Sequence, residues 1–184
     1  MFTDARSKKI VFVAHCLLNQ NSISDGTATW PGSAKHVVAL LLESEVGIVQ
    51  LPCPELNCLG LDRGNPDGSK SPLLQENSRI RAAMNQEAAR AKLTALVAPL
   101  VFQVSEYRNF GFQIKGIIGI NRSPSCGVET TSRNNREVEG RGVFMEALRR
   151  ALEENGLPLN MVGIKDSEPE RSLLTIRGLL APRD

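Results

Sequence analysis

The chain has 184 residues, a length that fits one domain with a sizeable apolar core. Apolar residues make up 41% of it and charged residues 23%, proportions that are ordinary for a globular domain and exclude a disordered or collagen-like chain. The formal net charge is only +2 and no long block of lysine and arginine occurs, so we expect no dedicated nucleic-acid surface. A small-molecule ligand is favoured over a polymer.

No stretch is long and apolar enough to cross a membrane, and the first residues lack the apolar segment of a signal peptide. We therefore expect a cytoplasmic protein without membrane contact. Four cysteines occur, and in a cytoplasmic chain of this size cysteines are more often catalytic or metal-binding than disulfide-bonded. The composition carries no signal for an oligomeric state.

The first predicted strand covers residues 8–16, where two lysines precede a near-continuous apolar run typical of a central parallel strand. It is predicted to end at Cys16. Strand alternation would point His15 away from Cys16, so we expect a packed histidine there rather than a ligand. Residues 17–27 are rich in amides and hydroxyls, too polar for a core and too long for a tight turn. We expect a loop that lines a site.

Ser33 is placed to cap a helix over residues 36–43, and a second strand is predicted over residues 47–51. That strand is followed at once by Cys53. Residues 56–77 then contain many glycines, prolines, asparagines and aspartates, which predicts a loop of about 20 residues. Loops of this length inside compact domains are usually functional or mobile.

Apolar residues at helical spacing predict a long helix over residues 78–110, kinked or split at Pro99 and closed by Gly111. The short β-branched run over residues 114–120 predicts a buried strand. This third strand leads into a polar turn that contains Cys126. Three predicted strands are thus each followed by a cysteine.

The turn after the third strand is built to present its side chains. Pro124 fixes its own φ and biases Ser123 toward an extended conformation. Gly127 permits a backbone geometry closed to other residues. We therefore expect Ser123, Ser125 and Cys126 to face a site.

The last part of the chain continues the alternation of helices and strands. Residues 127–142 are polar and predict a second long loop. A helix is predicted over 143–154, a short strand over 161–164 and a final helix over 168–180. We detect no internal repeat and no low-complexity segment.

This element order predicts an α/β fold: a single domain over residues 1–184 with an open parallel, Rossmann-like sheet and helices on both faces. In such sheets ligands bind outside the carboxyl ends of the strands. Cys16, Cys53 and Cys126 each follow a strand, so residues far apart in the sequence can converge there. We predict that these three thiols share one site.

Three thiolates from three strand ends suit a [4Fe-4S] cluster that leaves one iron open to a substrate. A structural zinc site is less favoured, because it usually takes four ligands at close local spacing and no CxxC pair occurs. Cys58 could complete a set of four. It lies between apolar residues, and we interpret it as a small buried hydrophobic residue.

Several motifs resemble those of the 2-thiouracil desulfidase family. Three carry most of the resemblance: Cys-Leu-Leu-Asn-Gln-Asn-Ser at 16–22, Cys-Pro-Glu at 53–55 and Ser-Pro-Ser-Cys-Gly at 123–127. Gly-Leu-Asp-Arg at 60–63 and Gly-Arg-Gly-Val-Phe-Met-Glu at 140–146 resemble a related subgroup of desulfidase-like proteins. The resemblance extends over nearly the whole chain in element order.

The resemblance implies an enzyme that removes sulfur from a small thiolated substrate, a thiouracil-type nucleobase, and releases hydrosulfide. Its cofactor would be an oxygen-sensitive [4Fe-4S] cluster held by Cys16, Cys53 and Cys126. The catalytic glutamate of the family falls on Glu55. Its catalytic serine falls on Ser123.

Substrate contacts are predicted at Asn19, in the amide-rich loop, and at Ser125, in the presented turn. The chain departs from better-known family members after Gly26 and after Arg63, where a usual tyrosine and a proline-rich pattern are missing. We expect these loops to set substrate choice. Arg63 and Arg122 flank the expected site and could meet an anionic group, although isolated arginines are usually solvated or paired at the surface.

Two other functions fit the same residues. Cys126 could be the nucleophile of an amidase-like α/β enzyme with a histidine as base. This alternative is weakened because neither histidine falls on an expected strand-end loop. The chain could also be a non-catalytic iron-sulfur carrier or sensor, which would hold a labile cluster and release no sulfide.

Overall fold

The computed structural model describes residues 2–182. Its centre is a parallel sheet of four strands in the order β2-β1-β3-β6, which confirms the predicted open α/β architecture. The strands are β1 (Lys9–Val13), β2 (Gly47–Gln50), β3 (Gln113–Ile120) and β6 (Met161–Ile164).

The central strands form where the sequence is apolar on both faces. In β1, every residue from Ile10 to Val13 is buried, and β3 is buried from Gly116 to Gly119. A strand that is apolar on both faces must be covered twice, which is the usual state of a parallel sheet. Ile118 of β3 pairs with Val13 of β1 on one side and with Val162 of β6 on the other.

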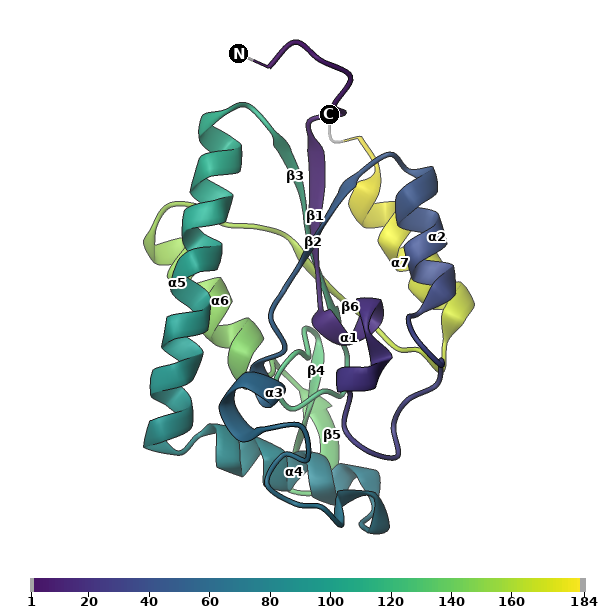
Figure 1. The fold of residues 1–184 in the computed structure, drawn as a ribbon, viewed down its shortest axis with the longest axis vertical. Helices are drawn as coiled ribbons and strands as arrows, with labels where there is room; N and C mark the ends of the chain where they lie inside the picture. The colour runs from purple at the N-terminus through teal and green to yellow at the C-terminus, as the bar shows by residue number, and fades with distance from the viewer. Residues whose placement is uncertain (1, 183–184) are drawn as a thin grey trace.

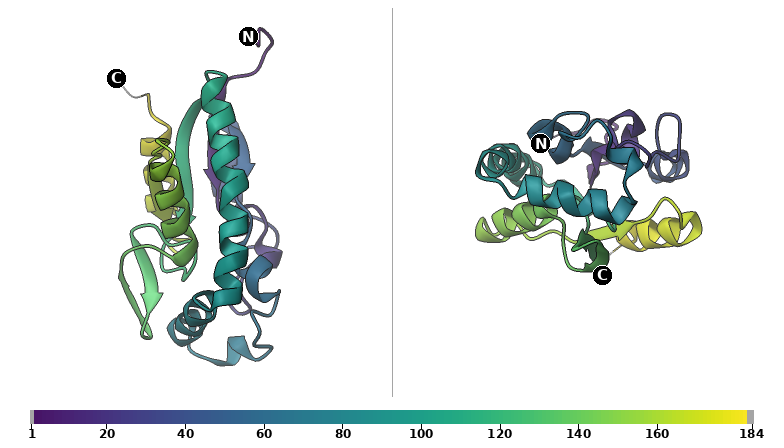
Figure 2. Two further views of the ribbon diagram at one scale, coloured as in Figure 1. Left: turned by 90° about the vertical axis from the view of Figure 1, so that its left-hand side faces the viewer. Right: turned by 90° about the horizontal axis from the view of Figure 1, so that it is seen from below.

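Helices cover both faces of this sheet, as predicted (Figure 1). One side is covered by α5 (Glu87–Asn109) and α6 (Val143–Glu154), and the other by α2 (Lys35–Glu43) and α7 (Pro169–Leu180). Figure 2 shows the sheet enclosed between these two helical layers. Phe12 and Phe144 are among the largest fully buried side chains, each worth about 1.5–3 kcal/mol of burial free energy.

Smaller elements gather beyond the carboxyl ends of the strands (Figure 1). They are the helices α1 (His15–Leu18), α3 (Pro54–Leu59) and α4 (Leu73–Met84), the 3-10 turns η1 (Gln20–Ser22) and η2 (Gly68–Lys70), and the hairpin β4 (Thr130–Arg133) and β5 (Arg136–Glu139). None of the helices within residues 2–182 is long and apolar enough to cross a membrane.

Two predictions in the N-terminal half were wrong, namely the end of the first strand and the helix cap at Ser33. Strand β1 ends at Val13, and Cys16 lies in helix α1 instead of ending the strand. Helix α2 begins after Ala34, and no side chain caps it, so Ser33 does not have the predicted role. The backbone N–H of Ala14 donates to Ile118 of β3 and is the last to bind the sheet. The N–H groups of Leu17 and Asn19 donate to Ala14 and His15 instead, so the strand ends before Cys16.

The predicted helix over 78–110 is two helices. Helix α4 starts earlier, at Leu73, and ends at Met84, and α5 begins at Glu87. The break therefore falls at residues 85–86, and α5 continues through Pro99, which is exposed. The separation has a packing reason, because α4 lies against the β4–β5 hairpin while α5 packs on β3 and α6.

Both predicted long loops contain regular structure. The segment 56–77 holds most of α3, the turn η2 and the start of α4, and 127–142 holds the β4–β5 hairpin. In that hairpin Asn134 and Asn135 both adopt positive φ (52° and 58°) between the paired Arg133 and Arg136. Asn-Asn in a two-residue hairpin loop is the sequence signal that could have located it.

Candidate functional site

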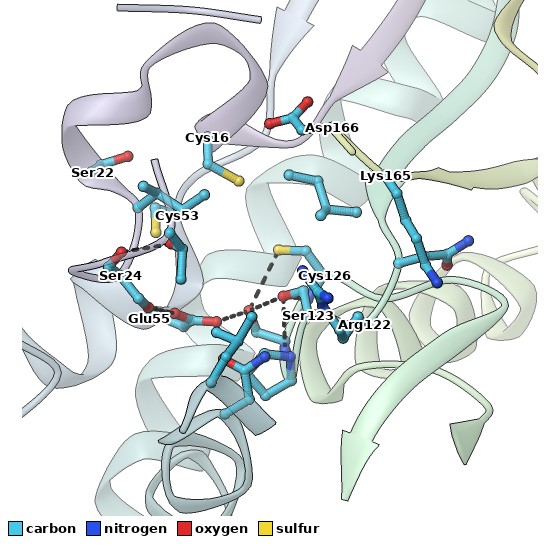
Figure 3. A pocket seen from close by; sticks show the side chains of 18 of the residues that line it. Cys16, Ser22, Ser24, Cys53, Glu55, Arg122, Ser123, Cys126, Lys165 and Asp166 are labelled. Carbon is cyan, nitrogen blue, oxygen red and sulfur yellow. Dashed lines mark hydrogen bonds between the residues drawn. The ribbon is translucent and has the colours of Figure 1, made fainter. Parts of the chain in front are cut away.

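The thiols of Cys16, Cys53 and Cys126 line one pocket of about 140 Å³ at the carboxyl ends of the sheet strands (Figure 3). Cys16 is reached from β1, Cys53 from β2 and Cys126 from β3. The parallel sheet brings the three strand ends to one edge, so the predicted convergence of the three cysteines is confirmed.

Cys53 is held at the start of helix α3. It is the N-cap residue, and its Sγ accepts the backbone N–H of Leu56 at 3.4 Å. Pro54 occupies the first helical turn, where a missing N–H costs nothing. Arg63 also donates from Nη2 to the Cys53 sulfur at 3.7 Å. Two N–H donors therefore point at this buried sulfur, and both oppose the larger effect of burial, which raises the pKa of the Cys53 thiol.

The turn that carries Cys126 is fixed by its own hydrogen bonds. The Oγ of Ser123 accepts the backbone N–H groups of Ser125 (3.3 Å) and Cys126 (3.0 Å). The carbonyl of Cys126 accepts the N–H of Ile120 at 2.9 Å, which returns the turn to the end of β3. Gly127 is required for space and not for φ, since a Cβ there would lie 2.2 Å from the carbonyl oxygen of Thr130. The prediction that Gly127 supplies an unusual backbone geometry was therefore wrong, and its role is to leave room for the backbone of Thr130.

Glu55 lies in the same pocket and is buried. Its Oε1 accepts a hydrogen bond from Ser125 Oγ at 2.6 Å, and its Oε2 accepts one from Ser24 Oγ at 3.3 Å. Arg63 completes the set through an ion pair between Nε and Oε2 at 3.1 Å. Figure 3 shows Glu55 directed toward the Ser123 and Cys126 side of the pocket.

Arg63 is buried, which differs from the usual surface position of an isolated arginine. Besides Glu55 and Cys53, it donates to the carbonyl oxygens of Ser22 and Leu61. Its backbone has a positive φ of 55°, so the turn after α3 is bent to bring the guanidinium inward. Sequence reasoning missed this because nothing in Gly-Leu-Asp-Arg signals burial of the charge.

The electrostatics of the pocket favour protonated thiols in the absence of a cation. Desolvation is the main cause that raises the pKa of Cys16 well above its usual range, with further contributions from the neighbouring thiols and carboxylates. Desolvation also raises the pKa of Cys53 and that of Cys126. Three thiolates that line one pocket would repel one another unless a positively charged group joined them.

The three thiols line one pocket but do not form a site for a single metal ion. Within residues 2–182, no three side chains of His, Cys, Asp or Glu converge closely enough to hold one metal ion. In a [4Fe-4S] cluster each cysteine binds a different iron, so the sulfurs need not approach a single point. The Cys53 sulfur also carries N–H donors of the kind that tune cluster thiolates.

Cys58 takes no part in this pocket. It is buried in the apolar core, and its Sγ donates to the carbonyl oxygen of Ala89 at 3.5 Å. The interpretation of Cys58 as a small buried hydrophobic residue is confirmed.

The two predicted substrate contacts lie in different places. Ser125 lines the pocket and binds Glu55. Asn19 does not line it: its Oδ1 accepts the backbone N–H of Asn21 at 3.1 Å and caps η1, and its Nδ2 lies 3.4 Å from His15 Nε2. The neighbour of Asn19, Gln20, approaches the pocket instead, because its amide donates to the pocket residue Asp166.

Neither histidine lines the pocket. His15 contacts Asn19, and His36 packs against Trp30 with ring centroids 5.3 Å apart. A Cys126 nucleophile would need a base within reach and a lowered pKa, whereas burial raises the pKa of this thiol. The geometry therefore does not favour the amidase-like alternative.

The fold and the pocket define an α/β protein with a thiol-lined site at the carboxyl edge of an open parallel sheet. No protein-family model matches the chain. A curated protein of Methanocaldococcus jannaschii, described as uncharacterized, is 27% identical over 165 residues, which are 90% of this chain and 91% of that protein. A solved structure of the [4Fe-4S]-dependent thiouracil desulfidase TudS is similar at a TM-score of 0.47 and 19% identity, over 91% of this chain and 97% of that one.

Proposed function

We propose that this protein is an enzyme that removes sulfur from a small thiolated compound, a thiouracil-type nucleobase, with the help of a [4Fe-4S] cluster. One observation carries the proposal: three thiols from three strand ends line a single pocket together with a buried carboxylate, Glu55. The motif resemblance at residues 16–22, 53–55 and 123–127 supports the same function. A pocket of about 140 Å³ suits a small molecule and not a polymer.

Cys16, Cys53 and Cys126 would hold the cluster. When bound, it would supply an iron without a protein ligand that acts as a Lewis acid on the sulfur of the substrate. The remaining chemistry belongs to side chains of the protein.

Glu55 is the proposed general base. Its Oε1 would receive a proton from the water that attacks the carbon of the C=S bond. The ion pair with Arg63 fixes the carboxylate, and the hydrogen bond from Ser125 directs Oε1 into the pocket. A base held by two partners can keep its orientation throughout the reaction.

Ser123 has a place in the same hydrogen-bond chain. Its Oγ lies 3.4 Å from Ser125 Oγ, which in turn donates to Glu55 at 2.6 Å. Ser123 could therefore pass a proton to Glu55 through Ser125. It also stabilises the turn that presents Cys126, so the proposed catalytic role comes in addition to a structural one.

The reaction needs no electron donor or acceptor. A C–O bond forms from water, the C=S bond is replaced by C=O, and sulfur leaves with its bonding electrons as hydrosulfide. One proton of water ends on that sulfur and the other is released through Glu55. The oxidation state of the ring carbon does not change.

Iron and acid-labile sulfide after anaerobic reconstitution test the proposed cofactor. We expect about four irons and four sulfides per chain in the wild type, and loss of both in Cys16→Ala, Cys53→Ala and Cys126→Ala. Cys58→Ala is the matched control, because Cys58 lies outside the pocket. Absence of iron from the wild type under these conditions would overturn the proposal.

Sulfide release from 2-thiouracil by the reconstituted protein tests the activity. Release of one hydrosulfide per uracil formed, without added reductant, is the expected result. A stable cluster with no sulfide release from any thiolated base would point instead to an iron-sulfur carrier or sensor.

A further inference from the structure

Asp166 follows the fourth strand of the sheet and lines the same pocket as the three thiols. It lies two residues after Ile164, the last residue of β6. Figure 3 shows its carboxylate beside Cys16, at the end of the pocket away from Glu55. All four strands of the sheet therefore contribute a side chain to this pocket, and the fourth contributes a carboxylate.

One oxygen of Asp166 is fully engaged. Its Oδ2 accepts hydrogen bonds from Gln20 Nε2 at 2.9 Å and from Thr29 Oγ1 at 3.2 Å. Gln20 is itself fixed, because its Oε1 accepts the backbone N–H groups of Thr29 and Trp30 and its side chain is buried. These contacts join segments 146 positions apart and leave the carboxylate little freedom to rotate.

The other oxygen has no partner. Asp166 Oδ1 is buried and accepts no hydrogen bond from any group within residues 2–182. The neighbouring ammonium of Lys165 does not serve it, because that group pairs with Glu137 at 2.7 Å. A buried carboxylate oxygen without a donor is unfavourable, and such groups in native proteins call for a ligand or a function.

We propose that Asp166 determines substrate specificity by accepting, at Oδ1, a ring N–H next to the C=S carbon. This inference rests on the proposed function and names the substrate class more closely: cyclic thioamides and thioureides that carry a free N–H beside the thiocarbonyl. The carboxylate is an acceptor only, so it selects against a substrate whose nitrogen is alkylated. Rejection by an unpaired buried polar group is a strong form of discrimination.

Binding of uracil, 1-methyluracil and 3-methyluracil to the reconstituted protein tests this inference without turnover. The ring and its N–H groups are those of the thiolated base, but no sulfur is present to be removed. We expect the wild type to bind uracil about tenfold more tightly than one of the two methyl derivatives, because that methyl group removes the N–H that Asp166 accepts.

The Asp166→Asn variant should lose this preference. An asparagine that still accepts from Gln20 and Thr29 turns its NH₂ toward the ligand, so a donor meets a donor. The dissociation constant for uracil should rise about tenfold and that for the discriminating methyl derivative should stay the same. Asp25→Asn, an exposed aspartate outside this pocket, should bind all three compounds like the wild type.

Iron content separates this role from others. Asp166→Asn should keep the iron and sulfide content and the absorption spectrum of the wild type. Loss of iron in the variant would make Asp166 a support of the cluster and would overturn the inference. An unchanged preference in Asp166→Asn, or no binding of any of the three pyrimidines by the wild type, would also overturn it.

The two proposals can fail separately. If the wild type held no cluster but its preference for a free N–H depended on Asp166, the proposed desulfidase function would fall and the specificity contact would stand. If sulfide release were normal but the preference for a free N–H did not depend on Asp166, the desulfidase function would stand and the specificity contact would fall.

Discussion

The guanidinium of Arg63 and the carboxylate of Glu55 form a buried ion pair, with Nε 3.1 Å from Oε2 and side chains only 3% and 9% exposed. The pair connects the segment after α3 with the residue that follows Cys53 by two positions. A buried pair of this kind is costly to desolvate, but it is far more costly to break on one side. It therefore serves to hold Glu55 in one place.

Removing the cation should destabilise the protein strongly. We expect Arg63→Met to lower the free energy of unfolding by about 3–5 kcal/mol, because a buried carboxylate loses its counter-charge. Urea unfolding of the cluster-free protein measures the effect. The double variant Arg63→Met with Glu55→Gln should recover much of the loss, since no charge then remains buried.

An exposed ion pair provides the control for that measurement. Arg171 pairs with Glu168 at 3.1 Å, but its side chain is 80% exposed. Arg171→Met should therefore change the free energy of unfolding by no more than about 1 kcal/mol. An equal decrease of the unfolding free energy in Arg63→Met and Arg171→Met would show that the buried Glu55–Arg63 pair stabilises the protein no more than an exposed ion pair does.

Glu55→Gln tests the base without a change of shape. The amide keeps the volume of the side chain but cannot take a proton from water, so sulfide release should fall by about 100-fold or more. Iron content should not change, because Glu55 is not a proposed ligand. Turnover at the wild-type rate with an intact cluster would show that another group is the base.

Much of this site could be predicted from the sequence because parallel strands impose it. Apolar runs identify the strands, and the carboxyl ends of such strands meet at one edge. That rule is sufficient to predict that Cys16, Cys53 and Cys126 share one site. It did not require the exact strand ends, and Cys16 reaches the pocket although it lies in a helix.

The contacts that complete the pocket could not be predicted in this way. Arg63 is buried because a positive-φ turn aims it inward, and Asp166 is fixed by Gln20, which lies 146 positions away. Local sequence patterns carry no information about such partners. Asn19 is a second example. The amide-rich composition of its loop predicts a substrate contact, but the Asn19 side chain caps η1 instead.

We predict that any side chain with a Cβ at position 127 displaces the turn that carries Cys126. A Cβ at this position would lie 2.2 Å from Thr130 O and 2.8 Å from Ser123 O, so the turn carrying Cys126 would have to move. We expect Gly127→Ala to cost about 1–3 kcal/mol of unfolding free energy and to lower the iron bound after reconstitution. Thermal unfolding and iron analysis measure the two effects.

Gly32 offers a matched control for that substitution. A Cβ there would have nothing within 4 Å, and Gly32 is not among the glycines with positive φ. Gly32→Ala should leave both stability and iron content close to those of the wild type. A loss of iron in both variants would mean that the effect is not specific to the Cys126 turn.

The buried Cys58 thiol should make stability depend on alkaline pH. Burial raises the pKa of Cys58 above the ordinary value of 9.0, so the unfolded chain releases this proton at a lower pH than the folded protein does. The stabilisation from a neutral buried thiol is thus fully present below pH 9.0 and is lost as pH rises through the folded-state pKa. Between about pH 9 and pH 10.5, the melting temperature of the cluster-free wild type should fall more steeply than that of Cys58→Ala, which lacks the titrating group. Parallel curves for the two proteins would mean that Cys58 ionises equally in the folded and unfolded states.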